Sequence, residues 1–426
     1  MRRSLIVTLE GQDVGTLQEN DGIWSLDYAP EWIKSGFPIS PGLPLRESIV
    51  DTGSDRPVQY FFDNLLPEED ARKRLIQSLN MGPLDAWQLL TLLGGESTGA
   101  LTLLPPGETL PAPDIRRLNN EDLEARIQAM PRIPLGEKAP KHMSIAGAQD
   151  KLLVHIDGNG QLHEPVGSEV STHILKPDSY SDHYPASSIN EWFCARLAKA
   201  LKLPITLVEL RYVPSSIYLI SRFDRYFASG KWWRKHVIDG AQLLSLYAGN
   251  KYQRSGAKGI LDIISLVRSK APTRIRLFQW TLFNVLIGNN DAHLKNVSFV
   301  VDRYGIALAP FYDMLSTASW STPEQVGAHG TVWPNIALTH PIGEATTFAD
   351  VRRKHLHEFG DQIGLPKRTV DMITNAMSGA ILQEARDIQS EFESRTDIPE
   401  KLHAGQSRMI RTILSMPISE MVKQLQ

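Results

Sequence analysis

The hydrophobic periodicity of the chain changes near residue 240, and this change restricts the fold more than any other feature. Before that point short strand-like runs alternate with single helical segments, whereas the rest of the chain is mostly helical. One β-like segment, residues 297–308, interrupts the helical half. We therefore expect an α+β fold in which a β-rich part is followed by a helical part.

The first 110 residues predict a small β-rich subdomain. Strand-like runs at residues 4–9, 14–18 and 23–28 flank turn residues and indicate a hairpin or meander. Helical periodicity follows at residues 58–79, a second helix is expected at residues 85–93, and the run ALTLL then forms another expected strand. The next segment, LPPGETLPAPD, is rich in proline and typical of a linker.

The remaining chain predicts two further parts, residues 111–235 and residues 236–426. The first contains strands around one helix at residues 188–202, which makes a small α/β lobe. The second is the helical lobe that carries the short β interruption. A small α/β lobe followed by a helical lobe is the layout of a protein kinase, although a layout by itself does not establish a function.

The composition argues against several classes of protein. The formal net charge is −3 and the isoelectric point is near 6.5, which weakens the case for a direct nucleic-acid binder. The single cysteine, Cys194, excludes a disulfide within the chain, and its apolar helical surroundings predict a small buried side chain. No apolar run approaches the roughly 18 residues of a membrane span, so a cytoplasmic protein is expected.

A polar segment, IGNNDAHLKN, has the spacing of a kinase catalytic loop. Phosphoryl transfer to a hydroxyl needs a carboxylate that accepts the hydroxyl proton and an amide oxygen that holds Mg²⁺. Asp291 and Asn296, five residues apart, can supply these two groups. A polar turn capped by Asn and Asp residues explains the same segment about as well.

Asp313 strengthens the catalytic interpretation. It follows an apolar strand and stands 22 residues beyond Asp291, a separation similar to that between the catalytic and the metal-binding aspartates of kinases. Two carboxylates and an asparagine placed around one hairpin can converge on a divalent cation. A simple helix-capping role for Asp313 explains this paired pattern less well.

Three upstream features have the order expected of a nucleotide site. Residues 144–151 contain small side chains that let backbone N–H groups approach phosphate oxygens. Lys176 ends an apolar strand and could pair with the phosphates of ATP, and Glu191 on the following helix is its natural ion-pair partner. Each feature alone also fits an ordinary turn or a solvated side chain, and their order is what favours a kinase.

Six segments together resemble the HipA family of bacterial toxin kinases. They are SIAGAQDKLLV, THILKPD, NEWFCARLAKALKLP, LISRFDRY, IGNNDAHLKN and LAPFYDMLS. Two N-terminal segments, FFDNLLPEEDARKRL and LLGGESTGALTLLP, are similar to the first domain of that family. The resemblance covers nearly the whole chain and implies a kinase-like two-lobed fold preceded by the β-rich subdomain.

The resemblance implies a role for each matching residue. Asp291, His293 and Lys295 match the catalytic loop, while Asn296 and Asp313 match the Mg²⁺ ligands. The matching positions for ATP are Ile145, Ala146, Gly147, Ala148, Gln149, Lys151, Lys176, Glu191 and, in the hinge that meets adenine, Ser221, Arg222, Phe223 and Asp224. Ser144 matches a serine that autophosphorylates in such proteins, and the added charge of about −2 would repel ATP and silence the kinase.

The resemblance also implies partners and a substrate. A small HipB-like antitoxin dimer with a helix-turn-helix would bind the kinase and link it to operator DNA, which would place the complex at the nucleoid. The expected substrate is an aminoacyl-tRNA synthetase, with glutamyl-tRNA synthetase as the leading candidate, so that phosphorylation would arrest growth. No membrane partner is expected.

Two other functions remain compatible with the sequence. A catalytically silent corepressor would serve as a scaffold on an antitoxin, but the retained Asp291, Asn296, Asp313 and Lys176 argue against it. A phosphatidylinositol-kinase-like small-molecule kinase also uses the D-x-H-x-x-N pattern found here. The N-terminal segments and the loop at Ser144 favour the toxin family.

Residues 222–236 gather basic and aromatic side chains, among them Arg222, Arg225, Trp232 and Trp233. They could form a patch for nucleic acid or a polypeptide, and an exposed hairpin turn is an equally good interpretation. The histidines show neither an HExxH pattern nor clustering with cysteine, which argues against a zinc site.

Overall fold

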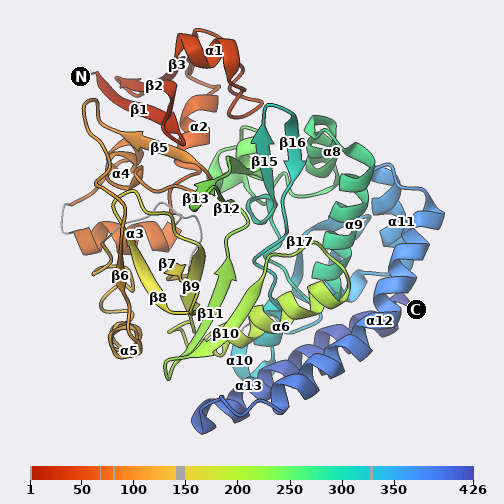
Figure 1. Cartoon of the computed structure of the whole chain (residues 1–426). Coiled ribbons are helices and arrows are strands. Elements are labelled where there is room, and N and C mark those ends of the chain that lie inside the picture. The colour runs from red at the N-terminus through yellow and green to blue at the C-terminus, as the bar shows by residue number, and fades with distance from the viewer. Residues whose placement is uncertain (1, 68, 80–81, 141–148, 327–329) are drawn as a thin grey trace. The chain divides into compact units, whose positions relative to one another are not determined.

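The computed structural model describes residues 2–67, 69–79, 82–140, 149–326 and 330–426 (Figure 1). The contacts within the chain divide it into two compact units, each built from three separate segments. Unit 1 comprises residues 1–175, 221–251 and 298–309, and unit 2 comprises residues 176–220, 252–297 and 310–426. The expected three-part division, with boundaries near residues 110 and 235, stays a prediction.

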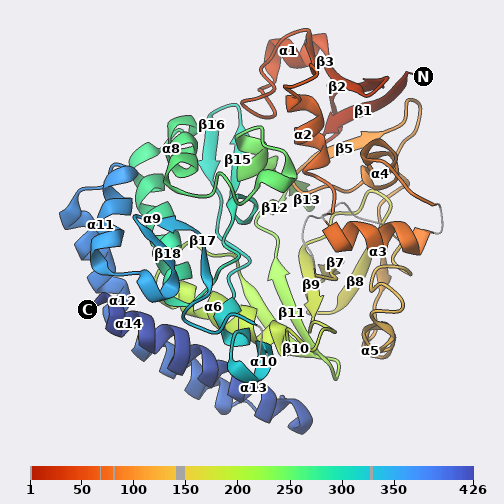
Figure 2. The same cartoon turned by 180° about the vertical axis from the view of Figure 1, so that it is seen from behind.

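The N-terminal sheet of unit 1 has the strand order β4–β3–β2–β1–β5, and all its pairs are antiparallel. Leu5 and Val7 on one strand and Trp24 and Leu26 on another are buried, as the period of two requires when one face covers a core. Figure 2 shows α2 and α4 against this sheet. The elements are β1 (Arg3–Leu9), β2 (Gln12–Asn20), β3 (Ile23–Tyr28), α1 (Pro30–Ser35), β4 (Ser48–Val50), α2 (Pro57–Asp63), α3 (Glu69–Leu79), α4 (Ala86–Leu93) and β5 (Leu101–Leu104).

The expected meander is therefore present, but the helical stretch expected at residues 58–79 is divided into α2 and α3. Asn64 follows α2, and its side-chain amide donates to the backbone oxygens of Tyr60 and Leu246 at 2.8 Å each. Pro67 follows three residues later and cannot donate a helical hydrogen bond. A distant backbone acceptor, which sequence periodicity does not reveal, thus helps to end the helix.

The rest of unit 1 contains a second sheet and two smaller β elements. In the second sheet β8 pairs with β6 and with β7, and β7 pairs with β9, all antiparallel. β14, β15 and β16 form a small sheet that contains the hairpin expected at residues 297–308. The elements are β6 (Asp114–Arg117), α5 (Asn120–Ala129), β7 (Leu152–Ile156), β8 (Leu162–Val166), β9 (His173–Pro177), β12 (Arg225–Ala228), β13 (Lys231–Arg234), β14 (Val237–Asp239), α7 (Gly240–Leu243), β15 (Ser298–Asp302) and β16 (Gly305–Leu308). The unit boundary falls within β9, before Lys176.

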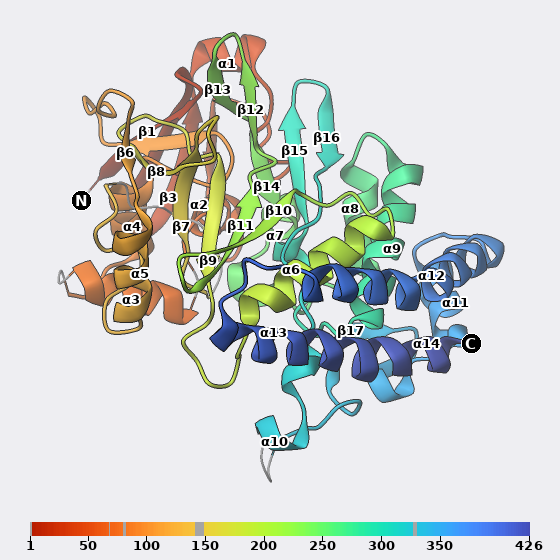
Figure 3. The ribbon, with the colours of Figure 1, turned by 60° about the horizontal axis from the view of Figure 1, so that its bottom comes forward.

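Unit 2 is mostly helical, with the hairpin β10–β11 and the short pair β17–β18 as its β elements among the described residues. Figure 3 shows α6 lying beside α12 and α13, and all three helices contact one another. The elements are α6 (Ser187–Ala200), β10 (Val208–Tyr212), β11 (Ser216–Ser221), α8 (Ala257–Leu266), α9 (Lys270–Leu286), α10 (Pro323–Val326), β17 (Ala337–Ile342), β18 (Ala345–Thr347), α11 (Arg353–Gln362), α12 (Lys367–Glu393), α13 (Glu400–Ile413) and α14 (Ser419–Leu425). Within the described ranges, none of these helices has the length and apolar content that a membrane crossing requires.

Candidate active site

Lys176, at the end of β9, forms two ion pairs within unit 2. Its Nζ lies 2.9 Å from Oε2 of Glu191 and 2.7 Å from Oδ1 of Asp313, and we call these three residues the lysine cluster. Burial alone would lower the pKa of Lys176, but the two carboxylates outweigh it and raise the pKa above its ordinary value. The lysine is therefore protonated, and the structure brings together the lysine and glutamate that the sequence paired.

Helix α6 holds Glu191 in place because almost every residue of the helix is buried. Next to Glu191, the Asn190 side chain accepts from the Ser316 backbone N–H at 2.7 Å and donates to the Ser316 backbone oxygen at 2.9 Å. This reciprocal pair ties α6 to the segment that follows Asp313. The sequence analysis missed the role of Asn190, although a polar side chain that is flanked by apolar residues needs a partner when it is buried and could have revealed it.

Asp313 has an unusual backbone conformation. Its φ is 56°, in the left-handed region that residues other than glycine seldom occupy. Just before it, Phe311 forms a parallel bridge with Ile205, in which the Phe311 N–H donates to the Pro204 oxygen at 2.7 Å. Such strain persists where the surroundings enforce it and is frequent at functional sites, so the conformation favours a working role for the Asp313 carboxylate.

The loop that carries Asp291 begins at a glycine that no other residue could replace without strain. Gly288 follows α9 with φ of 67°, and a Cβ there would lie only 2.5 Å from Cβ of Ala318 and 2.9 Å from Cβ of Pro417. The chain can therefore turn sharply out of α9 into residues 289–296.

Three side-chain oxygens then hold three consecutive backbone N–H groups of this loop. Asn290 N–H donates to Oγ1 of Thr317 at 2.8 Å, and Ala292 N–H donates to Oγ1 of Thr339 at 3.1 Å. Between them, Asp291 N–H donates to Oδ1 of Asn289 at 3.0 Å. The loop is thus fixed by hydrogen bonds rather than by regular secondary structure, which explains why its polar residues also resemble an ordinary turn.

The Asn296 amide nitrogen donates to the Asp291 backbone oxygen at 2.8 Å, which orients the Asn296 side chain. Tyr312 Oη donates to the Lys295 backbone oxygen at 2.8 Å and so joins the residue before Asp313 to the residue before Asn296. The Asn296 carbonyl oxygen and the Asp313 carboxylate are hard oxygen donors of the kind Mg²⁺ prefers. No group of three or more His, Cys, Asp or Glu ligands occurs among the described residues.

The Asp291 side chain is 45% exposed and has two close neighbours. Tyr252 Oη donates to Oδ1 of Asp291 at 2.6 Å, and His293 Nε2 lies 3.8 Å from the same oxygen. The Tyr252 and His293 rings meet edge to face with centroids 5.0 Å apart. Tyr252 carried no signal in the sequence, since it lies 39 residues before the loop in an irregular segment.

The predicted hinge lies in unit 1, and its side chains form a closed ionic network. Arg222 and Arg225 both contact Asp224, at 2.7 and 2.8 Å, and Arg225 contacts Glu96 at 3.1 Å. We call these four residues the hinge cluster. Burial alone would raise the pKa of Asp224, but the two guanidiniums hold it well below its usual range. Burial, with Arg222 nearby, lowers the pKa of Arg225 to about 10.

The hinge cluster corrects one expectation. The side chains of Arg222 and Arg225 are only 2% and 0% exposed, so they cannot belong to a surface patch for nucleic acid or a polypeptide. Residues 225–234 instead form the antiparallel hairpin β12–β13, in which Lys231 lies over the Trp233 ring at 3.7 Å. Of the two interpretations of this segment, the hairpin is confirmed.

The remaining expected ATP contacts are described only in part. Ser144, Ile145, Ala146, Gly147 and Ala148 lie outside the described residues. Gln149 and Lys151 are half-buried just before β7, and the Asp150 carboxylate between them lies 4.0 Å from Arg74. Gln149, Lys151 and the hinge residues Ser221 and Phe223 all belong to unit 1. The lysine cluster and residues 289–296 belong to unit 2.

Comparison with known proteins identifies the family. The HipA N-terminal domain matches residues 5–104, and the HipA-like C-terminal domain matches residues 143–385, more than half of the chain. The chain belongs to the HipA family. The serine/threonine-protein kinase toxin HipA of Shewanella oneidensis is 30% identical over 363 residues, which cover 81% of this chain and 79% of that protein. The kinase-named protein Y4mE of Sinorhizobium fredii is 32% identical over 434 residues, covering 96% of this chain and 99% of that protein.

The HipA-family resemblance and the fold class expected from the sequence are both confirmed. The Shewanella oneidensis HipA structure, solved with HipB and operator DNA, matches this chain with a TM-score of 0.81 and 25% identity. The match covers 99% of this chain and 97% of that one. The chain is therefore an α+β member of a kinase family.

Proposed function

We propose that this HipA-family chain is an ATP- and Mg²⁺-dependent serine/threonine protein kinase that acts as the toxin of a toxin–antitoxin pair. The observation that carries the proposal is the lysine cluster, in which Lys176 contacts Glu191 and Asp313. A buried Lys–Glu ion pair and a metal-binding aspartate are the parts that a protein kinase needs in place for phosphoryl transfer. The loop that contains Asp291 and Asn296 would supply the carboxylate that accepts the hydroxyl proton and a second Mg²⁺ ligand.

Each residue takes a role that suits its chemistry. Mg·ATP, when bound, supplies the phosphoryl group and neutralises its charge. Asn296 and Asp313 would hold the cation through their oxygens, and Lys176, kept in place by Glu191, would pair with phosphate oxygens. The exposed Asp291 carboxylate would orient the substrate hydroxyl and accept its proton. His293 and Lys295 would support this loop, and Lys295 would contact the γ-phosphate.

The hinge and the loop before β7 would hold the nucleotide. We propose that backbone groups of Ser221 and Phe223 meet adenine, and that residues 145–149 and Lys151 cradle the phosphates. The Asp224 carboxylate has a different task, because two arginines and the Gly99 N–H already occupy it. Asp224 would hold the hinge motif together and would act on the nucleotide through the position of the hinge backbone.

Mass spectrometry of the purified chain after incubation with Mg·ATP tests the proposal. We expect the wild type to gain phosphate and Asp291→Asn to gain none while keeping its melting temperature. Peptide mapping should place the phosphate on Ser144, the position that we propose for self-inactivation. If neither protein gains phosphate and neither binds ATP, the kinase assignment fails and a silent antitoxin-bound scaffold becomes the better account.

The partners and the substrate are proposed from the relatives. Because the similar Shewanella oneidensis HipA was solved with HipB and operator DNA, we propose a HipB-like helix-turn-helix antitoxin for this chain and contact with operator DNA mainly through it. Co-purification with the product of a neighbouring helix-turn-helix gene tests this partner.

The proposed substrate is a serine of an aminoacyl-tRNA synthetase, with glutamyl-tRNA synthetase first. Incubation of the kinase with γ-labelled ATP and purified glutamyl-tRNA synthetase should label the synthetase. Label that enters only lipids or small molecules from a lysate would instead favour a small-molecule kinase.

A further inference from the structure

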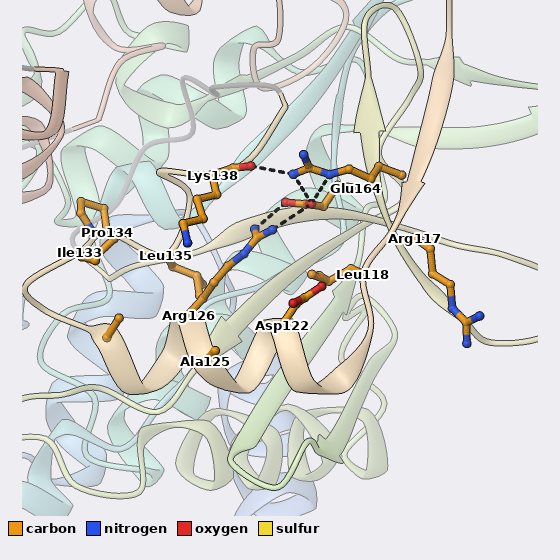
Figure 4. A pocket seen from close by; sticks show the side chains of 12 residues that line it. Arg117, Leu118, Asp122, Ala125, Arg126, Ile133, Pro134, Leu135, Lys138 and Glu164 are labelled. Atoms are coloured by element: carbon orange, nitrogen blue, oxygen red, sulfur yellow. Dashed lines mark hydrogen bonds and ion pairs between the residues drawn. The ribbon is translucent and has the colours of Figure 1, made fainter.

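Unit 1 contains a cavity of about 340 Å³ beside α5, and none of its lining residues has been given a role in the candidate active site (Figure 4). Four cationic residues line it, namely Arg116, Arg117, Arg126 and Lys138. Its acidic lining residues are Glu164 and Asp122, so the lining carries an excess of two positive charges. A concave site with unbalanced positive charge attracts anions.

Glu164 fixes the two central arginines of this cavity. Its carboxylate is 1% exposed and accepts hydrogen bonds from Arg116 and from Arg126, each at 2.6 Å. Arg116 Nη2 also donates to the Lys138 backbone oxygen at 2.6 Å. Each guanidinium is thereby held in one orientation before any ligand arrives, which lowers the entropy cost of binding.

One carboxylate cannot neutralise two guanidiniums and the nearby ammonium. Arg126 is 14% exposed and Arg116 is 49% exposed, so donors of both remain open to a ligand. Figure 4 shows the Lys138 amine on the same side of the cavity as the Arg126 guanidinium, whereas Arg117 points away. The charge excess is therefore concentrated around Arg116, Arg126 and Lys138.

The other wall of the cavity is aliphatic. Leu118 and Leu135 are 4% and 1% exposed, and Ala125 and Ala129 of α5 complete this wall. None of the described lining residues is aromatic, so no ring is present to stack on a nucleobase. The volume is at the lower end of the range typical of small-molecule sites.

We propose that this cavity binds a small organic phosphate, a phosphomonoester with an aliphatic body. Such a group carries a charge of about −1.5 to −2 at neutral pH. The three cations gathered around Glu164, namely Arg116, Arg126 and Lys138, exceed its single carboxylate by two positive charges. Arginine recognises phosphate through paired N–H donors, and the aliphatic wall would cover the body of the ligand. This site is independent of the proposed kinase function.

Calorimetric titration of the full chain with hexyl phosphate, in saturating Mg·ADP to fill a nucleotide site, tests the proposal. Ala125→Phe places a ring in the cavity from an exposed helix position, and Gln128→Phe places the same ring elsewhere on α5 as a control. We expect Ala125→Phe to weaken binding at least tenfold and Gln128→Phe to change it less than twofold, with the two melting temperatures alike. Lys138→Gln should weaken binding roughly threefold and reduce its dependence on salt.

Three further probes test the ligand class. Hexanol should not bind, inorganic phosphate should bind more weakly than hexyl phosphate, and hexanoate should bind more weakly because it carries a single charge. Binding of hexyl phosphate that Ala125→Phe leaves unchanged would overturn the site. Equal affinity for hexanoate would overturn the choice of a phosphate.

Discussion

The hinge cluster of unit 1 and the lysine cluster of unit 2 are both built from buried ion pairs, but they differ in charge balance. The hinge cluster has two arginines and two carboxylates, and none of its side chains is more than 6% exposed. The lysine cluster has one cation for two carboxylates, and Asp313 is 32% exposed.

This difference separates a cluster that holds the fold from one that can accept a ligand. A closed, neutral network has no charge left for a ligand, whereas removal of any member leaves an uncompensated buried charge. In the lysine cluster the two carboxylates outnumber the single ammonium, and the strained Asp313 is the more exposed of the two. An exposed carboxylate in a strained conformation can reach a divalent cation, and strained groups of this kind are typical of functional sites.

The largest expected effect is at Asp313, in the lysine cluster. We expect Asp313→Asn to lower the rate of phosphoryl transfer on the order of 10³-fold, because a neutral amide is a poorer Mg²⁺ ligand. Its melting temperature should stay close to that of the wild type, since the Asp313 carboxylate is partly solvated and Lys176 keeps Glu191 as a partner. Initial rates with labelled ATP measure the effect, and Asp361→Asn on the exposed face of α11 is the matched control.

The hinge cluster should respond in the opposite way. Glu96→Gln leaves Arg225 without its second carboxylate, and breaking a buried pair costs about 3 kcal/mol of the free energy of unfolding. Denaturant unfolding measures this loss, with Glu108→Gln at an exposed position as the control. The transfer rate per folded molecule should change little, so an activity loss without a stability loss would contradict the structural role of this cluster.

Low pH should protonate His236 of unit 1, whereas Asp224 in the hinge cluster of the same unit stays ionised. His236 donates from Nε2 to the Ile39 oxygen at 2.7 Å, and burial lowers its pKa to about 4. The unfolded chain binds this proton at higher pH, so stability is fully present above pH 6.5 and falls by about 2 to 3 kcal/mol towards pH 4.5. Asp224 stays ionised throughout this window because its pKa is held below its usual range.

Unfolding curves between pH 7 and pH 4.5 check this assignment. His236→Gln keeps a donor for the Ile39 oxygen but cannot titrate, and its stability should fall less steeply with pH. An unchanged slope would assign the acid sensitivity to other groups.

The smallest expected effect is at Tyr252, whose hydroxyl group contacts the exposed Asp291 carboxylate. Tyr252→Phe removes the hydrogen bond to Oδ1 of Asp291 without removing the ring beside His293. We expect a roughly fivefold lower rate of phosphoryl transfer, equivalent to about 1 kcal/mol in the barrier, because the carboxylate loses one orienting contact. A rate that rises instead would mean that Tyr252 blocks the carboxylate and does not orient it.

The sequence predicted the parts of the fold and site that depend on local order. The strands of the meander, the hairpin at residues 297–308 and the pairing of Lys176 with Glu191 follow from periodicity and from the order of motifs. The division between α2 and α3 could not be predicted, because it depends on the contact of Asn64 with Leu246, 182 residues away.

The residues that the sequence analysis missed share one property. Asn190, Tyr252 and Glu96 each act on a residue far along the chain, and the spacing of residues along the sequence does not point to those partners. The burial of Arg222 and Arg225 was misjudged for the same reason, since their acidic partner Glu96 lies in the N-terminal part of unit 1. Charge partners of this kind become visible only after folding.

The most direct test of the account is binding of ADP, with and without Mg²⁺, to the wild type, Asp313→Asn and Glu96→Gln under conditions where all three are folded. We expect Mg²⁺ to strengthen ADP binding by the wild type and by Glu96→Gln, and to have little effect on Asp313→Asn. The opposite pattern, in which Asp313→Asn keeps the Mg²⁺ effect and Glu96→Gln loses it, would contradict the assignment of the lysine cluster as the ligand site and the hinge cluster as a structural network.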